Sequence, residues 1–412
     1  MTGEGIPDVM LAQRIAAQRD GWTLEQDFYT SPAIFQRDLE RVFRRHWLFA
    51  GALCRIPKAG DYFLYEVANE SIIVMRGEGE QVHALFNVCR HRGSRILLEP
   101  CGHAERLICP YHQWMYAQDG SLTEARLMPP DFDVKQFGLH RAAVRVVEGL
   151  IFICLSEAPP DFDEVLADFV PYFRTYGFAT ARIAHVERHE VKANWKLIAE
   201  NVRECYHCDA THPEYCRAVS GARIHGNPRR GETDAEMEAR WKQLGLETKH
   251  VRFVPGQRHH CARYPLTRGF TSWSIDGKPV APLMGAHRER DNSLVGAVLY
   301  PNFWSESPCD YATTTRVTPV SPTRCAVEIT WYVDGKAVEG VDYDVGKLTK
   351  VWAATAAQDM QLCENNQAGV ESSRYRPGPY SPYEVNGRCD HVDRWYLQEL
   401  SHASEGPSHA AH

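Results

Sequence analysis

The stretch NVCRHRGSRILLEPCGHAERLICPYHQWMY, residues 87–116, decides the fold class of the N-terminal half of this chain. It places one cysteine and one histidine in each of two short segments, Cys89 with His91 and Cys109 with His112. Seventeen residues separate the two pairs, and nearby glycine and proline permit tight turns. Cysteine and histidine at this spacing indicate a metal site built from two loops.

Two kinds of metal site accept two cysteines and two histidines. Zinc binds such sets, but finger-type sites usually pair cysteine with cysteine and histidine with histidine. In a Rieske-type [2Fe–2S] cluster, two thiolates hold one iron and two imidazoles hold the other. The mixed pairs therefore favour the iron–sulfur cluster, and a structural zinc site is the alternative. Cys101 and His103 break the symmetry of the two loops, so we expect them not to be ligands.

Composition excludes several classes of protein. The chain has 412 residues, 44% of them hydrophobic and 24% charged, as in a soluble protein of two domains. A net charge of −7 gives no reason to expect a nucleic-acid partner. No signal peptide and no apolar run of membrane-spanning length is present, so we expect no membrane association. Thirteen scattered cysteines favour a reduced, cytoplasmic protein.

The order of sequence patterns predicts an α+β chain. Residues 37–50 have the pattern of an amphipathic helix leading into a strand, and short β runs with turn signals follow to about residue 157. Helical spacing occupies 191–208 and 343–370, and strand patterns occupy 294–300, 311–320 and 325–333. We therefore expect an N-terminal helical segment (1–44) packed on the catalytic domain, a small antiparallel β domain (45–157), a second domain with helices on an antiparallel sheet (158–400), and a disordered tail (401–412).

A second metal site is indicated in the second domain. His207 and His212 are five residues apart, about 140° around a continuous helix, so both could not face one ion. Pro213 disfavours helical geometry at His212, so we expect His207 in the last turn of a helix and His212 just beyond it. Asp359 lies on an apolar stripe of the later helix, with the residues Leu348, Trp352, Thr355 and Leu362. An acid on a core face needs a partner, which is either an arginine or helix N-terminus, or a metal.

These motifs resemble one known family. CRHRG and CPYHQWMY are similar to the two cluster-binding segments of Rieske non-haem iron oxygenase alpha subunits, the ring-hydroxylating oxygenases, although Gln113 stands where the common form has glycine. ENVRECYHCDATH and QDMQLCENNQAGV resemble the segments that supply the 2-His-1-carboxylate iron ligands. The resemblance implies a Rieske domain, a helix-grip catalytic domain, and His207, His212 and Asp359 as ligands of mononuclear iron.

The same resemblance implies how the two metals communicate. In the family, an acid at the position of Glu204 contacts an iron-ligand histidine and a cluster-ligand histidine of a neighbouring subunit, which requires a homotrimer. The residue-based alternative is an exposed salt-bridging glutamate. Asn201 would be a polar residue near the iron, and Tyr206 would be either a proton donor or a packing residue. Most members have aspartate at this position, and glutamate is typical of the branch that demethylates quaternary ammonium compounds.

That branch, which includes oxygenases of glycine betaine, proline betaine (stachydrine) and carnitine, is also the one that SSRYRPGPYSPYEVNGRCDHVDRWY resembles. The resemblance implies a monooxygenase that hydroxylates an N-methyl group with O2 and releases formaldehyde, supplied with electrons by a separate NAD(P)H-dependent reductase. Trp273, Phe303 and Trp304 are candidate aromatic residues for binding the cation. An aromatic-ring oxygenase, and more distantly a Rieske electron carrier without oxygenase activity, are the alternatives.

Overall fold

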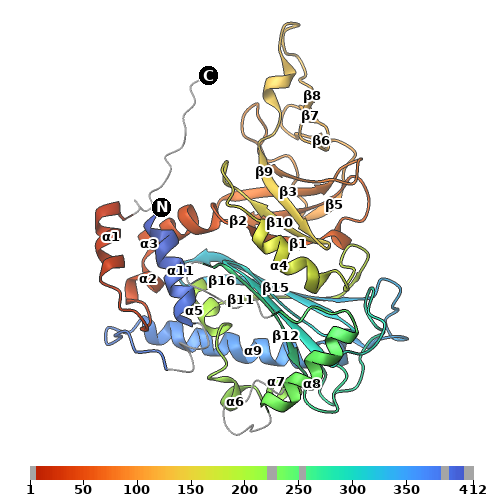
Figure 1. Cartoon of the computed structure of the whole chain (residues 1–412). Coiled ribbons are helices and arrows are strands. Elements are labelled where there is room, and N and C mark those ends of the chain that lie inside the picture. The colour runs from red at the N-terminus through yellow and green to blue at the C-terminus, as the bar shows by residue number, and fades with distance from the viewer. Residues whose placement is uncertain (1–5, 220–229, 250–256, 382–388, 403–412) are drawn as a thin grey trace.

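The computed structural model describes residues 6–219, 230–249, 257–381 and 389–402 (Figure 1). Their strands form sheets of seven, six and three strands, and every pairing between named strands is antiparallel. The α+β fold class is confirmed. No helix in the described part of the chain is both long enough and apolar enough to cross a membrane.

The seven-stranded sheet carries the two cysteine–histidine loops. Its order is β1-β10-β9-β4-β3-β2-β5. The strands are β1 (Leu48–Ala52), β2 (Asp61–Val67), β3 (Glu70–Arg76), β4 (Val82–Phe86), β5 (Cys101–His103), β9 (Arg141–Val147) and β10 (Leu150–Cys154). The short strands β6 (Leu107–Ile108), β7 (Met115–Tyr116) and β8 (Leu122–Glu124) form the small third sheet, which ends the molecule on that side (Figure 1).

The six-stranded sheet belongs to the second half of the chain, in the order β11-β16-β15-β14-β13-β12. The strands are β11 (Arg182–Val191), β12 (His259–Pro265), β13 (Ser293–Leu299), β14 (Phe303–Ser307), β15 (Ala312–Ser321) and β16 (Arg324–Val333). The predicted strands at 294–300, 311–320 and 325–333 are therefore confirmed, whereas β11, β12 and β14 were not predicted. One face of this sheet packs towards helix α9 (Val345–Val370), and the other face packs towards the first sheet. Helix α9 corresponds to the helix predicted at 343–370.

The remaining helices lie around these sheets. They are α1 (Asp8–Ala16), α2 (Gln26–Thr30), α3 (Pro32–Asp38) with a π-helical turn (Leu39–Phe43), α4 (Asp163–Phe173), α5 (Trp195–Asn201), α6 (Cys208–Thr211), α7 (Pro213–Ala218), α8 (Arg230–Gln243) and α11 (Cys389–Ser401). The predicted helix leading into a strand over 37–50 is present, but its helical part begins earlier, at Pro32, and ends at Phe43, before β1 begins at Leu48. The predicted tail (401–412) stays a prediction, because 403–412 lie outside the described residues. The division into domains at residue 157 stays a prediction.

A buried acid ties the N-terminal helices to the catalytic half. Asp38, fully buried, accepts hydrogen bonds from Trp195 Nε1 (3.0 Å) and Tyr396 Oη (2.7 Å) and pairs with the buried Lys196. Asn194 caps α5 by accepting the backbone N–H of Lys196 at 2.9 Å. Since α5 leads directly to the histidine segment, these contacts fix where that segment starts.

Candidate metal centres and the cavity beside the second centre

The two cysteine–histidine loops have the same construction. The backbone N–H of Gly93 donates to the carbonyl of Cys89, and that of Gln113 donates to the carbonyl of Cys109, both at 2.9 Å. Gly93 and Gln113 both have a positive φ, +76° and +60°. This positive φ explains why glycine is the common residue at position 113, because a left-handed backbone is costly for a residue with a Cβ. Gln113 adopts that conformation in spite of the cost.

The four predicted cluster ligands converge. The Nδ1 atoms of His91 and His112 lie 3.1 Å apart, and Cys89 Sγ lies 3.2 Å from the Tyr116 hydroxyl. Cys89 and Cys109 are buried, with burial the largest cause of a raised pKa for Cys89, whereas His91 is exposed. Two imidazole nitrogens that face each other gain a common partner when a metal binds between them, so this donor set fits a [2Fe–2S] cluster. Cys101 and His103 lie in β5, where His103 Nδ1 pairs with Asp61 at 2.9 Å.

The segment with the second pair of histidines differs from the prediction in its helix boundary. The helix expected over 191–208 ends at Asn201, so His207 does not occupy its last turn. His207 instead precedes the short helix α6 and His212 follows it, with a non-helical φ and ψ of −115° and 70° before Pro213. The expected change of chain direction at His212 is therefore present. The end of α6 at His212, together with its non-helical backbone there, allows both imidazoles to face one side.

Asp359 on α9 meets both imidazoles. Its Oδ1 lies 3.2 Å from His207 Nε2 and 2.8 Å from His212 Nε2. Burial alone would raise the pKa of Asp359, but the hydrogen bonds to the two histidines outweigh it and lower that pKa. Burial likewise opposes protonation of His207, and its bonds to Asp359 and Glu204 outweigh it and raise the pKa to about 9. Of the expected stripe, Leu348, Trp352 and Thr355 are buried, but Leu362 is only half-buried and Cys363 takes the core position instead.

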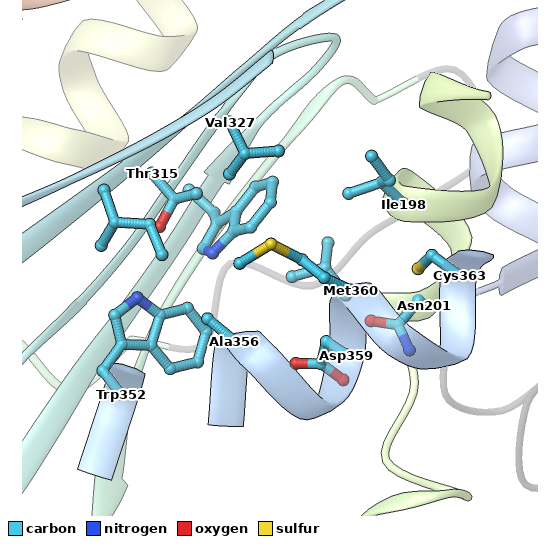
Figure 2. Close-up of a pocket in the computed structure, with 12 residues that line it drawn as sticks. Ile198, Asn201, Thr315, Val327, Trp352, Ala356, Asp359, Met360 and Cys363 are labelled. Atoms are coloured by element: carbon cyan, nitrogen blue, oxygen red, sulfur yellow. The ribbon is translucent and has the colours of Figure 1, made fainter. Parts of the chain in front are cut away.

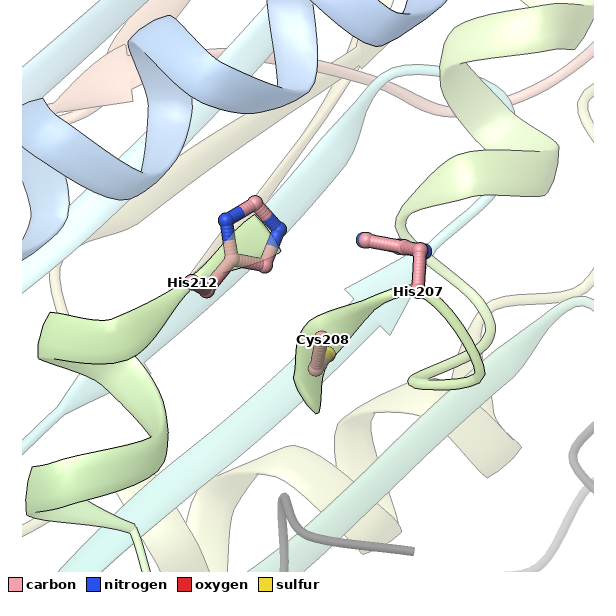
Figure 3. Close-up of side chains that lie close together, drawn as sticks. All are labelled: His207, Cys208 and His212. Atoms are coloured by element: carbon pink, nitrogen blue, oxygen red, sulfur yellow. The ribbon is translucent and has the colours of Figure 1, made fainter. Parts of the chain in front are cut away.

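Two nitrogens and one carboxylate oxygen directed at one point fit an iron of the 2-His-1-carboxylate type. Cys208 Sγ also lies within 4.8 Å of the imidazole nitrogens (Figure 3). It forms a disulfide with Cys205, however, and a disulfide sulfur does not provide a thiolate ligand. We therefore favour Asp359 as the third ligand. The expectation that the cysteines are all reduced is wrong for Cys205 and Cys208.

Three polar side chains surround the histidines. Glu204 Oε1 lies 2.5 Å from His207 Nδ1, and its Oε2 accepts the backbone N–H groups of Tyr206 and of His207, the latter at 3.3 Å. Asn201 Nδ2 lies 3.5 Å from His207 Nε2. Gln358 Oε1, which sequence reasoning missed, lies 2.8 Å from His212 Nδ1. Glu204 and Gln358 therefore orient one imidazole each, as carboxylate and amide partners of ligand histidines do. Tyr206 is half exposed.

A small, partly open cavity lies beside Asp359, between α5, α9 and the six-stranded sheet (Figure 2). Its walls are mainly apolar. The lining residues are Ile198, Asn201, Val202, Trp304, Thr315, Val327, Ile329, Trp352, Ala356, Asp359, Met360 and Cys363. An apolar cavity with few polar groups next to an iron site is the usual form of a small-molecule binding site.

The three aromatic residues predicted to contact substrate have different surroundings. Trp304 lines the cavity. Phe303, its neighbour in β14, points to the opposite sheet face and packs against Phe49 and Phe152 at centroid distances of 4.8 and 5.4 Å. Its predicted contact with substrate is therefore contradicted by this placement. Trp273 is fully buried and lies 5.5 Å from Trp352, behind the cavity wall.

Sequence reasoning missed the residues that share a sheet face with Trp304. Thr315 is the direct cross-strand neighbour of Trp304, and Ile329 is that of Thr315. Glu306, two residues from Trp304 in β14, is buried with its carboxylate 3.3 Å from the Tyr215 hydroxyl. Burial, reinforced by the charge of Asp359, raises the pKa of Glu306 to about 8. Strand alternation is the only signal for these residues, and it does not tell which face lines a cavity.

Comparison with known proteins gives concordant results. The Rieske [2Fe–2S] domain family matches residues 46–138, and the catalytic-domain family of ring-hydroxylating alpha subunits matches 178–402. The chain is 38% identical to the glycine betaine monooxygenase oxygenase subunit of Chromohalobacter salexigens over 93% of this chain and 87% of the relative. Its counterpart from Pseudomonas aeruginosa is 37% identical over 94% and 91%.

Solved structures share the fold. The quaternary ammonium Rieske monooxygenase CntA in complex with L-carnitine superposes with a TM-score of 0.69 at 22% identity, over 97% of this chain and 100% of that one. Naphthalene 1,2-dioxygenase from Rhodococcus sp. has a TM-score of 0.68 at 17% identity, over 97% and 99%. The chain thus belongs to the ring-hydroxylating oxygenase alpha subunits and is a Rieske-type non-haem iron oxygenase, with a [2Fe–2S] cluster and a mononuclear iron.

Proposed function

We propose that this chain is the oxygenase component of a monooxygenase that demethylates a quaternary ammonium compound such as glycine betaine or proline betaine. The observation that carries the proposal is the 37–38% identity to glycine betaine monooxygenase oxygenase subunits over nearly the whole chain. The cavity supports it, because its mainly apolar walls suit N-methyl groups, which have no hydrogen to donate.

In the proposed reaction, one N-methyl C–H bond becomes C–OH, and the second atom of O2 leaves as water after uptake of two electrons and two protons. The C–N bond of the hydroxymethyl amine then breaks, which releases formaldehyde and the amine with one methyl fewer. The metals, when bound, supply electron relay and O2 activation. The chain's own residues hold the methyl group beside Asp359 and exclude water with the walls of Ile198, Val327 and Met360.

We further propose the site residues. Cys89, His91, Cys109 and His112 would hold the cluster, and His207, His212 and Asp359 the mononuclear iron. Glu204 would orient His207 through Nδ1 and connect it to a cluster-ligand histidine of another subunit. Figure 1 supports transfer between subunits, because the β6–β7 loop with Cys109 and His112 and helix α6 between His207 and His212 lie at opposite ends of the molecule. A homotrimer and a separate NAD(P)H-dependent reductase complete the proposal.

A single-turnover experiment tests the proposed function. Iron-replete protein is reduced chemically and mixed with O2 and one compound of a panel that contains glycine betaine, proline betaine, carnitine, choline and aromatic acids. We expect formaldehyde with one ammonium compound, and none with D359A as the matched control. Hydroxylated aromatic product without formaldehyde from any ammonium compound would instead assign the chain to ring oxidation. Three irons and two sulfides per chain are expected, whereas an electron carrier would have two irons.

A further inference from the structure

Three buried hydrogen-bond donors at the cavity have no partner among the described residues. They are Trp304 Nε1, Thr315 Oγ1 and Trp352 Nε1, and all three residues line the cavity. Thr315 is fully buried and Trp352 is 4% exposed. An unsatisfied buried donor costs about 1–3 kcal/mol, so three such groups at one cavity call for an acceptor that the fold itself does not provide.

These donors come together for a reason that lies in the fold. Trp304 and Thr315 are paired directly across β14 and β15, so their side chains leave the same sheet face as neighbours. Trp352 reaches the cavity from α9, which covers that face. Figure 2 shows Thr315 and Trp352 on one side of the cavity with the Thr315 hydroxyl and the Trp352 indole nitrogen directed into it, and Asp359 and Asn201 on the other side. The cavity is therefore polar at two ends and apolar between them.

The ends differ in chemistry. Among the lining residues, Asp359 is the only carboxylate, and none is a lysine, arginine or histidine. A ligand that enters this cavity thus meets the proposed iron ligand at one end and neutral donors at the other. Seven residues of α9 separate Asp359 from Trp352, which corresponds to a rise of roughly 10 Å. That spacing suits a short molecule with its N-methyl groups near the iron that Asp359 would hold and an acceptor at the far end.

We propose that Trp304 Nε1, Thr315 Oγ1 and Trp352 Nε1 form a carboxylate subsite, which makes the enzyme specific for zwitterionic betaines over cations without a carboxylate, such as choline. The inference rests on the proposed function and deepens it. The carboxylate accepts the three hydrogen bonds, and this orientation turns the N-methyl groups towards Asp359. An uncharged aromatic hydrocarbon would leave all three donors unsatisfied, which a buried site penalises strongly.

Binding measurements on the iron-replete protein test the subsite without turnover. The variants T315V, W304F and W352F each remove one donor and keep shape or aromatic surface. Titration calorimetry with glycine betaine, choline and tetramethylammonium gives the affinities. We expect glycine betaine to bind roughly tenfold or more weakly to each variant, since hydrogen bonds to charged groups have about this value. Choline and tetramethylammonium should change less than about threefold, because they have no carboxylate.

W331F is the matched control, because Trp331 is also fully buried with an unpartnered Nε1 but does not line the cavity. It should leave the ratio of glycine betaine to choline affinity unchanged. A second readout is the melting temperature: T315V should be at least as stable as the wild type without ligand and gain less from glycine betaine. Equal weakening of all three ligands, or no weakening of glycine betaine, would overturn the subsite.

The two proposals fail differently in this experiment. The wild type reports on the proposed function, since an enzyme for betaines must bind glycine betaine or proline betaine and release formaldehyde from it. The variants report on the subsite. A wild type that demethylates glycine betaine, with an unchanged betaine-to-choline ratio in T315V and W352F, refutes the subsite alone. A wild type that binds neither betaine refutes both.

Discussion

Glu306 gives a prediction whose magnitude follows from the structure. Its carboxyl group is buried beside Tyr215 and has a pKa of about 8 instead of 4.5. The folded protein therefore holds this proton more tightly than the unfolded chain does. Stability is then lost as the pH rises from about 4.5 to about 8, at about 1.4 kcal/mol per pH unit and at most about 5 kcal/mol in total. E306Q resembles the neutral form and should not show this loss.

The measurement is the melting temperature of wild type and E306Q between pH 5 and pH 9. The two proteins should melt alike near pH 5, and the variant should melt higher by roughly 1.5–3 °C for each further pH unit up to about 8. An iron held by Asp359 would add positive charge and lower the pKa of Glu306, so removal of the mononuclear iron should widen the pH range of this effect. E78Q, at an exposed position, is the control and should show no such trend. A difference between wild type and E306Q that is the same at pH 5.5 and 8.5 would refute the assignment of a neutral, buried carboxyl.

Five further substitutions separate the parts of the site. E204Q should keep three irons per chain but slow product formation roughly 10–100-fold. Rapid-quench measurements of turnover after cluster reduction give this rate. A rate equal to that of the wild type would show that Glu204 does not take part in electron transfer. D359A should lose the mononuclear iron and keep two irons and two sulfides, which metal analysis detects; three retained irons would contradict its role. C109S should lose the visible absorbance of the cluster, whereas C101S at the exposed position should not. Q113G should raise the stability of the cluster loop by about 1 kcal/mol, seen as slower thermal loss of cluster absorbance, because Gln113 has a φ of +60°.

The sequence predicts those features that short segments determine alone. The cluster loops, the long helix with Asp359 and three strands of the six-stranded sheet follow from spacing and periodicity. The end of α5 does not, because nothing in Val202 or Arg203 excludes a helix. The helix stops where the carboxylate of Glu204 takes the backbone N–H groups of Tyr206 and His207, a local bond that competes with helical hydrogen bonding.

The residues of the cavity could not be predicted for a different reason. Trp304 and Thr315 become neighbours only through the pairing of β14 with β15, and a shift of one residue would turn both to the other face. Phe303 shows the consequence, because it was as plausible as Trp304 in the sequence and packs in the core on the opposite side. The disulfide between Cys205 and Cys208 could not be predicted either, because it depends on the turn that brings these two cysteines together.

One face of the six-stranded sheet concentrates groups that lower stability. Glu306, Trp304 and Thr315 lie side by side on β14 and β15, and each buries a carboxyl, an indole N–H or a hydroxyl where an apolar group would pack at lower cost. Unpartnered donors occur elsewhere, but Trp331, for example, does not line this cavity. Conflicts between local packing and polarity are expected where function requires them. Because the donors stand opposite Asp359 at one cavity, the ligand that removes the conflict must carry its acceptor at a fixed distance from the atom to be oxidised. This geometry connects the stability of the fold to the choice of substrate.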